Sequence, residues 1–302
     1  MINTPAIAQL LRPGLRAITG QYPTYPDEWT EIFKTYTSDK YQEIEVEMKY
    51  LGLAGIKPEG QPGITDSMGQ RIVTSYVHKR VQIGFTITKE AMEDDLYKTH
   101  FPMQAVSLRK SLSTTKNVLG ANILNNAFNA NYPTGDGQPI CSASHPVDGG
   151  VFANSLAVPT ALSVAALQQM IILMQKMPMQ SGILAQTKAQ KLIIPPELQF
   201  NASVILNSTY VPLNGNNAIN PINYENYIPK GYKVNNFLTN PTAYFLLTDA
   251  PDGFKHYQRT PIESDTYVDY QTDNIMAKAG ERYSMGITNV RAVVGSLGTV
   301  AA

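Results

Sequence analysis

Two neighbouring stretches in which apolar and polar residues alternate constrain the fold of this 302-residue chain more than any other feature. Ile44, Val46 and Met48 alternate with charged residues, and a second alternating run covers residues 77–87. A period of two residues is the pattern of a β-strand whose two faces meet different environments. Between the runs, residues 55–63 are rich in Gly and Pro, which favours a long exposed turn. We therefore predict an extended two-stranded hairpin over residues 41–88.

An isolated hairpin is only marginally stable, so this one needs a surface to lie against, and an adjacent subunit would provide it. The preceding residues 1–40 contain four prolines that exclude a long helix, Pro5, Pro13, Pro23 and Pro26. They also contain more apolar residues than a disordered tail would. We expect either an arm extended on a neighbouring subunit or a short helix packed on its own domain.

The hairpin is followed by a helix start, where Thr88 can act as the N-cap and acidic residues lie near the positive end of the helix. Pro102 resets the helix, and apolar residues spaced by three and four predict a helix over residues 102–128, about 40 Å long. Further helices are predicted over residues 159–177 and 197–207, and a helix or turn near 274–279. Short strands are predicted at 191–194, 243–247, 266–270 and 288–294. This order indicates an α+β fold and not a doubly wound sheet.

Charge is scarce in this sequence. Charged residues make up 16% of the chain, and 24 basic side chains balance 24 acidic ones. Proteins dedicated to binding nucleic acid usually carry a basic excess, because they neutralise phosphates. The balance argues against sequence-specific recognition but leaves non-specific contact with DNA open. Arg109, Lys110 and Lys116 lie in a helical stretch without acidic residues, so they form either a solvated helix face or a surface that contacts DNA.

No catalytic or metal-binding pattern is persuasive. Cys141 is the single cysteine, which excludes an intrachain disulfide and suits a reducing compartment. It lies four residues before His145 in a Gly/Pro-rich loop, a poor geometry for a nucleophile and its base, so a Cys/His hydrolase is only an alternative. The histidines are scattered. We expect no enzyme activity, no cofactor and no metal. We also expect no membrane association and no signal peptide, since no apolar run approaches the roughly 20 residues of a membrane span.

Three stretches resemble the major capsid proteins of tailed bacteriophages, which have the Hong Kong 97-type fold, and more narrowly the major head subunit of Mu-like phages. Residues 85–95 are similar to the junction between the family's extended loop (the E-loop) and its spine helix. Residues 135–146, with their Asp-Gly and Ser-x-x-His-Pro motifs, are similar to the loop after that helix, and residues 257–295 to the last strands. The resemblance covers nearly the whole chain from Tyr41 onward.

The resemblance implies a division of the chain into an N-terminal arm (1–40), an E-loop hairpin (41–88), a peripheral domain with the spine helix (89–154 and 254–290) and an axial domain (155–253 and 291–302). It implies a shell subunit that assembles into hexamers and pentamers around double-stranded DNA. The expected location is the virion, with assembly in the host cytoplasm. A scaffolding protein, a portal and a decoration protein are the further partners it implies. A bacterial encapsulin-like compartment shell is the alternative within the same fold.

The chain lacks the long charged scaffolding segment with which some relatives begin, so we expect scaffolding to be a separate protein, or the numbering to start at the mature end. We expect salt-sensitive contacts between subunits, in which basic residues of the hairpin meet acidic residues at the helix start. The residues assigned to these contacts are Lys57, Arg71, Lys79, Arg80, Glu90, Asp94 and Asp95. Arg109, Lys110 and Lys116 are assigned to an inward surface that faces DNA. A covalent crosslink from Lys57 to an Asn is not expected, because no matching acid is evident.

Overall fold

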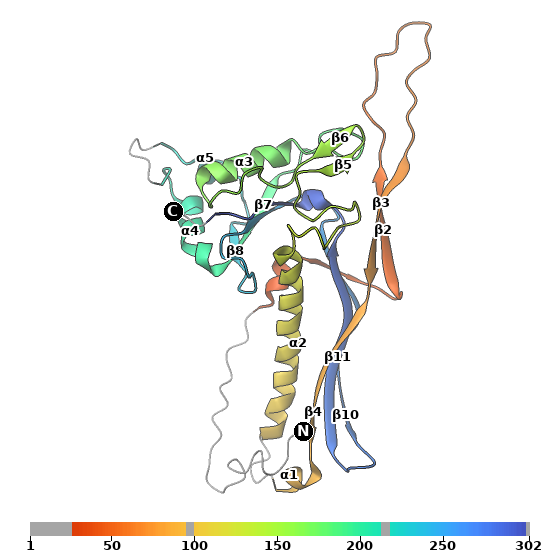
Figure 1. Cartoon of the computed structure of the whole chain (residues 1–302), viewed down its shortest axis with the longest axis vertical. Coiled ribbons are helices and arrows are strands. Elements are labelled where there is room, and N and C mark those ends of the chain that lie inside the picture. The colour runs from red at the N-terminus through yellow and green to blue at the C-terminus, as the bar shows by residue number, and fades with distance from the viewer. Residues whose placement is uncertain (1–25, 95–99, 213–217, 300–302) are drawn as a thin grey trace.

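A long helix lies beside a twisted ribbon of strands, and a second group of helices and strands covers one end of both (Figure 1). This computed structural model describes residues 26–94, 100–212 and 218–299. The long helix is α2 (His100–Asn125) and the ribbon is a four-stranded sheet of order β1-β10-β11-β4. We call α2 and this sheet the elongated unit, and the group at its end the end unit.

The sheet of the elongated unit is dominated by one long antiparallel hairpin. Strands β10 (Phe254–Val268) and β11 (Ile275–Ile287) pair along their whole length, and β4 (Lys79–Ile87) adds antiparallel to β11. On the other side β1 (Lys34–Thr37) pairs parallel with the start of β10. Helix α2 buries Leu108 and Leu112 against Ala279 of β11, as their spacing of four residues requires.

The end unit is built on a second sheet of order β12-β9-β7-β8. Its strands are β7 (Ala189–Ile194), β8 (Tyr232–Val234), β9 (Tyr244–Thr248) and β12 (Val293–Ser296). Residues 192–194 of β7 and 244–247 of β9 are continuous apolar runs, because side chains on both faces of these strands are buried there. Around this sheet lie α3 (Val164–Gln175), η3 (Pro196–Leu198), α4 (Gln199–Asn207) and α5 (Pro221–Tyr224). Ser163 caps α3 by accepting the Ala166 N–H.

One apolar cluster joins the two units. It combines Leu124 from α2, Phe254 from β10 and Phe245 from β9 with two residues near the start of the described chain. These are Trp29, in the short helix η2 (Glu28–Glu31), and Phe33, directly before β1. A separate cluster inside the end unit packs the inner face of α3 onto β7 and β9. The described residues directly before β1, 26–33, are therefore part of the structural core, whereas residues 1–25 of the predicted arm lie outside the described residues.

A separate two-stranded hairpin, β2 (Gln42–Lys49) and β3 (Gly69–Val77), runs past the end unit and projects beyond it (Figure 1). Residues 50–68 form its tip. The remaining short elements are α1 (Lys89–Glu93), β5 (His145–Val147), β6 (Gly150–Phe152) and η4 (Val290–Ala292). Thr88 accepts the Ala91 N–H through its hydroxyl, so the predicted cap of α1 is confirmed.

The structure confirms the helices predicted over residues 102–128, 159–177 and 197–207 and the strands at 191–194 and 243–247. Within the strand predicted at 288–294, the short helix η4 comes first and β12 begins only at Val293. Three further predictions are corrected. The second alternating run is not the partner of residues 44–48: it is β4, which pairs with β11, while β2 pairs with the preceding β3. Residues 274–279 are not a helix but the start of β11, and the short strand expected at 266–270 is the end of the long β10. The long β10–β11 hairpin was missed because charged and small residues obscure its period of two.

Candidate assembly surface

On strand β2 of the β2–β3 hairpin, the polar side chains are turned toward the subunit itself and the apolar side chains are turned away from it. Glu43, Glu45 and Glu47 pair in register with Tyr76, Thr74 and Ile72 of β3. Side chains alternate between faces along a strand, so these residues share one face. Glu43, Glu45 and Glu47 are only 17–20% exposed as side chains, whereas Ile44 on the opposite face is 55% exposed. The orientation is the reverse of a strand that covers its own core.

Each charged side chain of the inward face has an oppositely charged partner. Glu45 lies 2.6 Å from the Lys255 ammonium, and it also accepts the hydroxyls of Tyr257 and Thr288. Glu47 lies 2.8 Å from Nη1 of Arg291.

The pairs made by Glu43 and Lys49, near the two ends of β2, are more exposed than those of Glu45 and Glu47. Lys49 lies 2.7 Å from Asp148, and Glu43 accepts the Ser38 hydroxyl at 2.7 Å and the Lys40 ammonium at 3.2 Å. We call these four contacts the ion-pair ladder. Alternate residues of β2 therefore fasten the hairpin to the subunit body.

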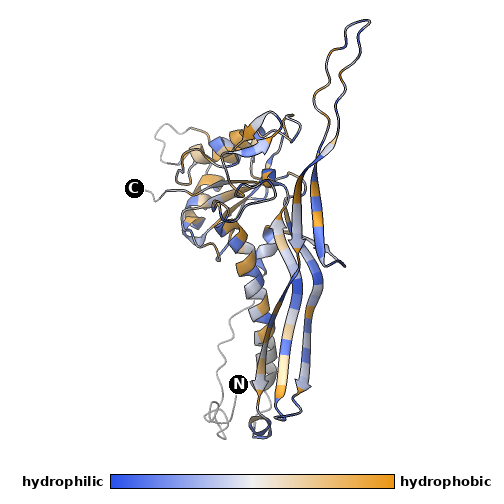
Figure 2. Ribbon diagram, turned by 45° about the vertical axis from the view of Figure 1, so that its right-hand side comes forward, coloured by the Kyte–Doolittle hydropathy of each residue, from blue (hydrophilic) through white to orange (hydrophobic). Residues whose placement is uncertain are grey.

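The opposite face of the hairpin is apolar and uncovered. Val46 and Val73 are register partners on it, and Ile44, Met48 and Val77 extend it along both strands. Val73 is 52% exposed, and the tip residues Leu53 and Ile56 are 80% and 97% exposed. Figure 2 shows apolar and polar residues interspersed along this ribbon. Contiguous exposed apolar surface of this kind marks a protein-interaction site.

A cleft of about 380 Å³ lies where the hairpin meets the rest of the chain. Its walls include Glu45 and Glu47 from β2, Met179 and Gln180 from the end unit, and Arg291 from η4. Burial lowers the pKa of Arg291, against the attraction of Glu47, and the guanidinium stacks 4.7 Å from the Phe152 ring. The hairpin is thus held by ion pairs around a cleft and by the burial of Ile72 and Tyr76 of β3 on the same inward face.

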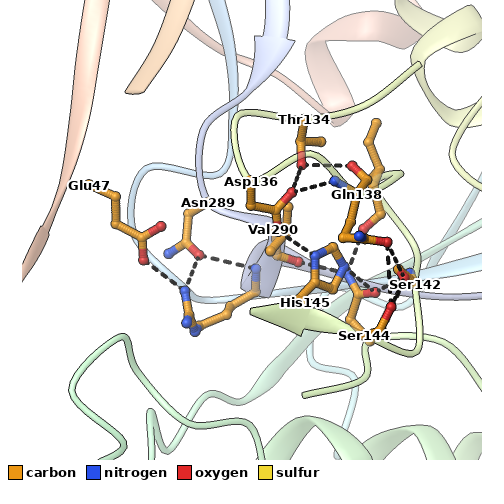
Figure 3. Close-up of polar contacts among 12 residues, drawn as sticks. Glu47, Thr134, Asp136, Gln138, Ser142, Ser144, His145, Asn289 and Val290 are labelled. Atoms are coloured by element: carbon orange, nitrogen blue, oxygen red, sulfur yellow. Dashed lines mark hydrogen bonds and ion pairs between the residues drawn. The ribbon is translucent and has the colours of Figure 1, made fainter. Parts of the chain in front are cut away.

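The loop after α2 is fixed by a buried hydrogen-bond network (Figure 3). His145 Nδ1 lies 2.6 Å from Asp136 Oδ2, and its Nε2 lies 3.0 Å from Asn154 Oδ1. The Asn154 amide donates to the carbonyls of Ile140 and Val290, which ties the loop to η4. Burial by itself raises the pKa of Asp136, but hydrogen bonds from His145, Thr134 and the Gln138 N–H outweigh it and lower that pKa.

This network speaks against the hydrolase alternative. Both nitrogens of His145 are engaged by groups other than Cys141. The Cys141 thiol is buried, and burial raises its pKa far above the ordinary value. A nucleophilic cysteine needs the reverse, an accessible thiol with a lowered pKa.

Among the residues assigned to intersubunit contacts, the structure brings one into an ion pair within the chain. Arg71 lies 2.5 Å from Asp148, beside the ladder. The others described, Lys57, Lys79, Arg80, Glu90 and Asp94, are exposed. Asp95 lies outside the described residues. Lys57 is on the surface because it lies in the hairpin tip, and Lys79 is on the surface at the start of β4.

Two of the three residues assigned to DNA contact, Arg109 and Lys110, are exposed on α2. The assignment of Lys116 is wrong for this structure, because its side chain is only 7% exposed and its ammonium lies 2.5 Å from Glu281 of β11. That ammonium also faces the rings of Trp29 and Tyr283 at 5.2 and 4.9 Å. The residues next to Lys116 in sequence include no acid, so the sequence did not reveal its partner Glu281, which lies far along the chain.

Sequence reasoning missed Glu45 and Glu47 as anchors, together with their partners Lys255 and Arg291. A strand of alternating glutamates was the available signal, but alternation alone does not show which face is turned toward the subunit. Over the described ranges, no group of three or more potential ligands could hold a metal ion. In the same ranges no helix is both long and apolar enough to cross a membrane.

Residues 72–296 match the family model described as phage capsid protein. Among curated proteins none matches the sequence significantly. Solved structures of phage capsids share the fold at low sequence identity. The capsid of Myoviridae phage XM1 aligns with a TM-score of 0.60 at 12% identity, over 97% of this chain and 98% of that one.

Two further structures align over almost all of both chains. One is from Microbacterium phage Oxtober96, with a TM-score of 0.59 at 8% identity, covering 98% of each chain. The other is from Mycobacterium phage Cain, with a TM-score of 0.56 at 10% identity, covering 100% of each. The elongated unit, the end unit and the projecting hairpin are thus the parts of a known architecture. The chain belongs to the phage capsid protein family, and it is a major capsid protein with the Hong Kong 97-type fold.

Proposed function

We propose that this subunit assembles into hexamers and pentamers of an icosahedral shell around double-stranded DNA, and that the apolar face of the β2–β3 hairpin is its main adhesive surface. The observation that carries the proposal is the reversed orientation of the hairpin. Its polar face is satisfied within the subunit, so the exposed apolar face is free for a neighbour. Burying apolar area is the dominant favourable term in most protein association, at about 25 cal/mol per Å².

The domain boundaries follow from the same proposal. The elongated unit would be the peripheral domain, with α2 as its spine, and the end unit would be the axial domain. The exposed side chains of Phe200, Tyr210 and Tyr224 on the end unit support a second contact surface near the centre of each capsomer. Many modest contacts made at once give a stable shell without any one strong interface.

Finer assignments rest on the sequence resemblance. We infer a Mu-like head subunit that assembles in the host cytoplasm with a separate scaffolding protein and a portal, and that can carry a decoration protein. The exposed charges Lys57, Lys79, Arg80, Glu90 and Asp94 are suited to salt-sensitive contacts at the rim of interfaces. Asp95 belongs to the same proposed set. Arg109 and Lys110 are suited to non-specific contact with phosphates.

Negative-stain electron microscopy of the purified 33.2 kDa protein after size exclusion tests the proposal. We expect shells, tubes or rings of five or six subunits. If no assembly forms from the protein alone, the same grids are prepared with crowding agents and with the scaffolding protein. A chain that stays monomeric under all three conditions would overturn the proposal.

A further inference from the structure

His145 lies inside the protein, close to η4, which connects β11 of the elongated unit to β12 of the end unit. Its side chain is fully buried, and the side chain of its partner Asp136 is 2% exposed. Both ring nitrogens face an oxygen: Nδ1 is 2.6 Å from Asp136 Oδ2, and Nε2 is 3.0 Å from Asn154 Oδ1. A neutral imidazole has one N–H only, so its second nitrogen needs a donor as its partner. The charge of His145 is therefore decided by whether either oxygen can supply a proton.

The orientation of the Asn154 carboxamide is set by the backbone around it. Its nitrogen donates to the carbonyls of Ile140 and Val290, at 2.6 and 3.1 Å, and a carbonyl oxygen only accepts. Its oxygen accepts the Ser142 N–H at 2.8 Å. Exchanging the nitrogen and the oxygen would set an acceptor against two carbonyls and a donor against an N–H. Asn154 therefore presents an oxygen to His145, and Nε2 must carry a hydrogen to bond it.

The Asp136 carboxylate determines the state of the other nitrogen. Its Oδ1 accepts the Thr134 hydroxyl at 2.5 Å and the Gln138 N–H at 3.0 Å. Burial raises the pKa of Asp136, but these hydrogen bonds and the one from His145 outweigh it, so the pKa is lowered and the group is ionised. Imidazole is also the more basic of the two groups, so the proton between them belongs to the ring. His145 thus donates from both nitrogens, which only the charged ring can do.

The neighbouring charges are compatible with a cation at this place. The Phe152 ring of β6 lies 5.1 Å from the imidazole ring and 4.7 Å from the Arg291 guanidinium, so it contacts both cations. Arg291 of η4 is paired with Glu47 of β2 at 2.8 Å, as His145 is with Asp136. Buried charges are tolerated when they are paired and hydrogen-bonded, and both cations here meet that condition.

We propose that His145 is a buried imidazolium whose second proton locks the loop after α2 to η4. With a neutral ring and the same contacts, one nitrogen would face its partner oxygen as a second acceptor, where no water can replace the lost hydrogen bond. Relieving the contact at Nε2 would require Asn154 to turn and give up its bond to Val290, which ties the loop to η4. The inference concerns the single subunit, so it holds or fails independently of shell assembly.

The test is ¹⁵N magnetic resonance of the full-length protein with labelled histidine at pH 8. Protonated and unprotonated ring nitrogens have well-separated chemical shifts, so a charged ring is distinguished from either neutral form. The chain has four histidines. One with the ordinary pKa of about 6.5 is neutral at pH 8. Burial lowers the pKa of His78, and it lowers that of His256 to about 4. We expect a single ring with both nitrogens protonated.

Three variants make the result specific. His145→Gln should remove this signal, and His100→Gln, the matched control at the start of α2, should leave it unchanged. Asp136→Asn removes the counter-charge and should leave a neutral ring at pH 8, because a buried cation without a partner is costly.

The absence of a doubly protonated ring in the wild type would overturn the proposal. Loss of the signal in His100→Gln would do the same, as would its persistence in folded His145→Gln or in folded Asp136→Asn. If His145→Gln does not fold, as judged by circular dichroism, His100→Gln decides the assignment, because His78 and His256 are neutral at this pH.

Discussion

Lys116 of α2 and Glu281 of β11 form an ion pair inside the protein, with 2.5 Å between Nζ and Oε2 and both side chains at most 7% exposed. Burial raises the pKa of Glu281, and the attraction of Lys116 only partly offsets this. The pair joins the helix to the sheet at the place where Trp29 also packs, so it fixes the segment before β1 as well.

Replacing Lys116 with Met should lower the free energy of unfolding by about 3–5 kcal/mol, because it leaves a buried carboxylate without its partner. The loss should be largest at neutral pH. It should diminish as the pH falls toward 4.5, since protonated Glu281 needs no cation. Urea unfolding of the subunit at pH 7 and pH 4.5 measures both effects.

The double variant Lys116→Met with Glu281→Leu should recover most of this stability, because it removes both charges together. Arg109→Met on the exposed side of the same helix is the matched control and should change stability by no more than about 0.5 kcal/mol. A single variant as stable as this control would contradict the role given to the pair.

Removing apolar area from the outer face of the hairpin should block assembly without unfolding the subunit. Ile44→Ser with Val73→Ser should change the free energy of unfolding by less than about 2 kcal/mol, because β-propensity effects span about 1 kcal/mol for each substitution. Electron microscopy and size exclusion should show no closed shells. Ile44→Leu with Val73→Ile is the conservative control and should assemble. Normal shells from the Ser variant would exclude this face as the main contact.

Single surface charges should matter little. Arg80 is exposed, and an exposed ion pair contributes under about 1 kcal/mol. Arg80→Ala should therefore still form shells, which should dissociate at a somewhat lower salt concentration than the wild type. Light scattering over a salt titration measures this, and complete loss of assembly would refute it.

Asp136→Asn should lower the free energy of unfolding by about 1.5–3 kcal/mol at pH 7, the range for hydrogen bonds to a charged group. The Asp136 pKa lies below its ordinary value of 3.8, so the contribution of this carboxylate is present above that value and is lost as the pH falls below it. The difference between variant and wild type should therefore shrink at pH 3. A constant difference at both pH values would assign the effect to packing.

The Cys141 thiol should resist labelling in the folded subunit, because it is buried and burial raises its pKa. An Ellman-type reagent at pH 8 should react at the rate of unfolding and stoichiometrically in denaturant. Rapid labelling of the native protein would revive the hydrolase alternative.

The elements that could be predicted from the sequence are those whose signal is local. Thr88 caps α1, and the apolar spacing of Leu108 and Leu112 specifies α2. Strand pairing was harder, because two alternating runs give no information on which strand lies next to which. In the structure β4 pairs with β11, which lies almost 200 residues later in the sequence, and β2 pairs with β3.

The candidate site was predicted in outline and not in detail. Alternation at Ile44, Val46 and Met48 identified a two-faced strand, but periodicity does not say which face is turned inward. The direction was decided by Lys255 and Arg291, distant cations whose positions depend on the tertiary fold. The same limitation misassigned Lys116, because the carboxylate that neutralises it is 165 positions away in sequence.

Alternate residues of strand β2 serve two different surfaces. One set contacts the strand's own subunit, and the other set forms the exposed outer face. The odd-numbered residues from Glu45 to Lys49 form ion pairs with Lys255, Arg291 and Asp148, and the even-numbered residues lie on the outer face. Inserting one residue at the start of β2 would turn the charged side chains outward and the apolar side chains inward, so the ion pairs and the outer apolar face would both be lost. Inserting two would shift the ladder but keep each face in its place. The strand can therefore change length in evolution by pairs of residues far more readily than by one.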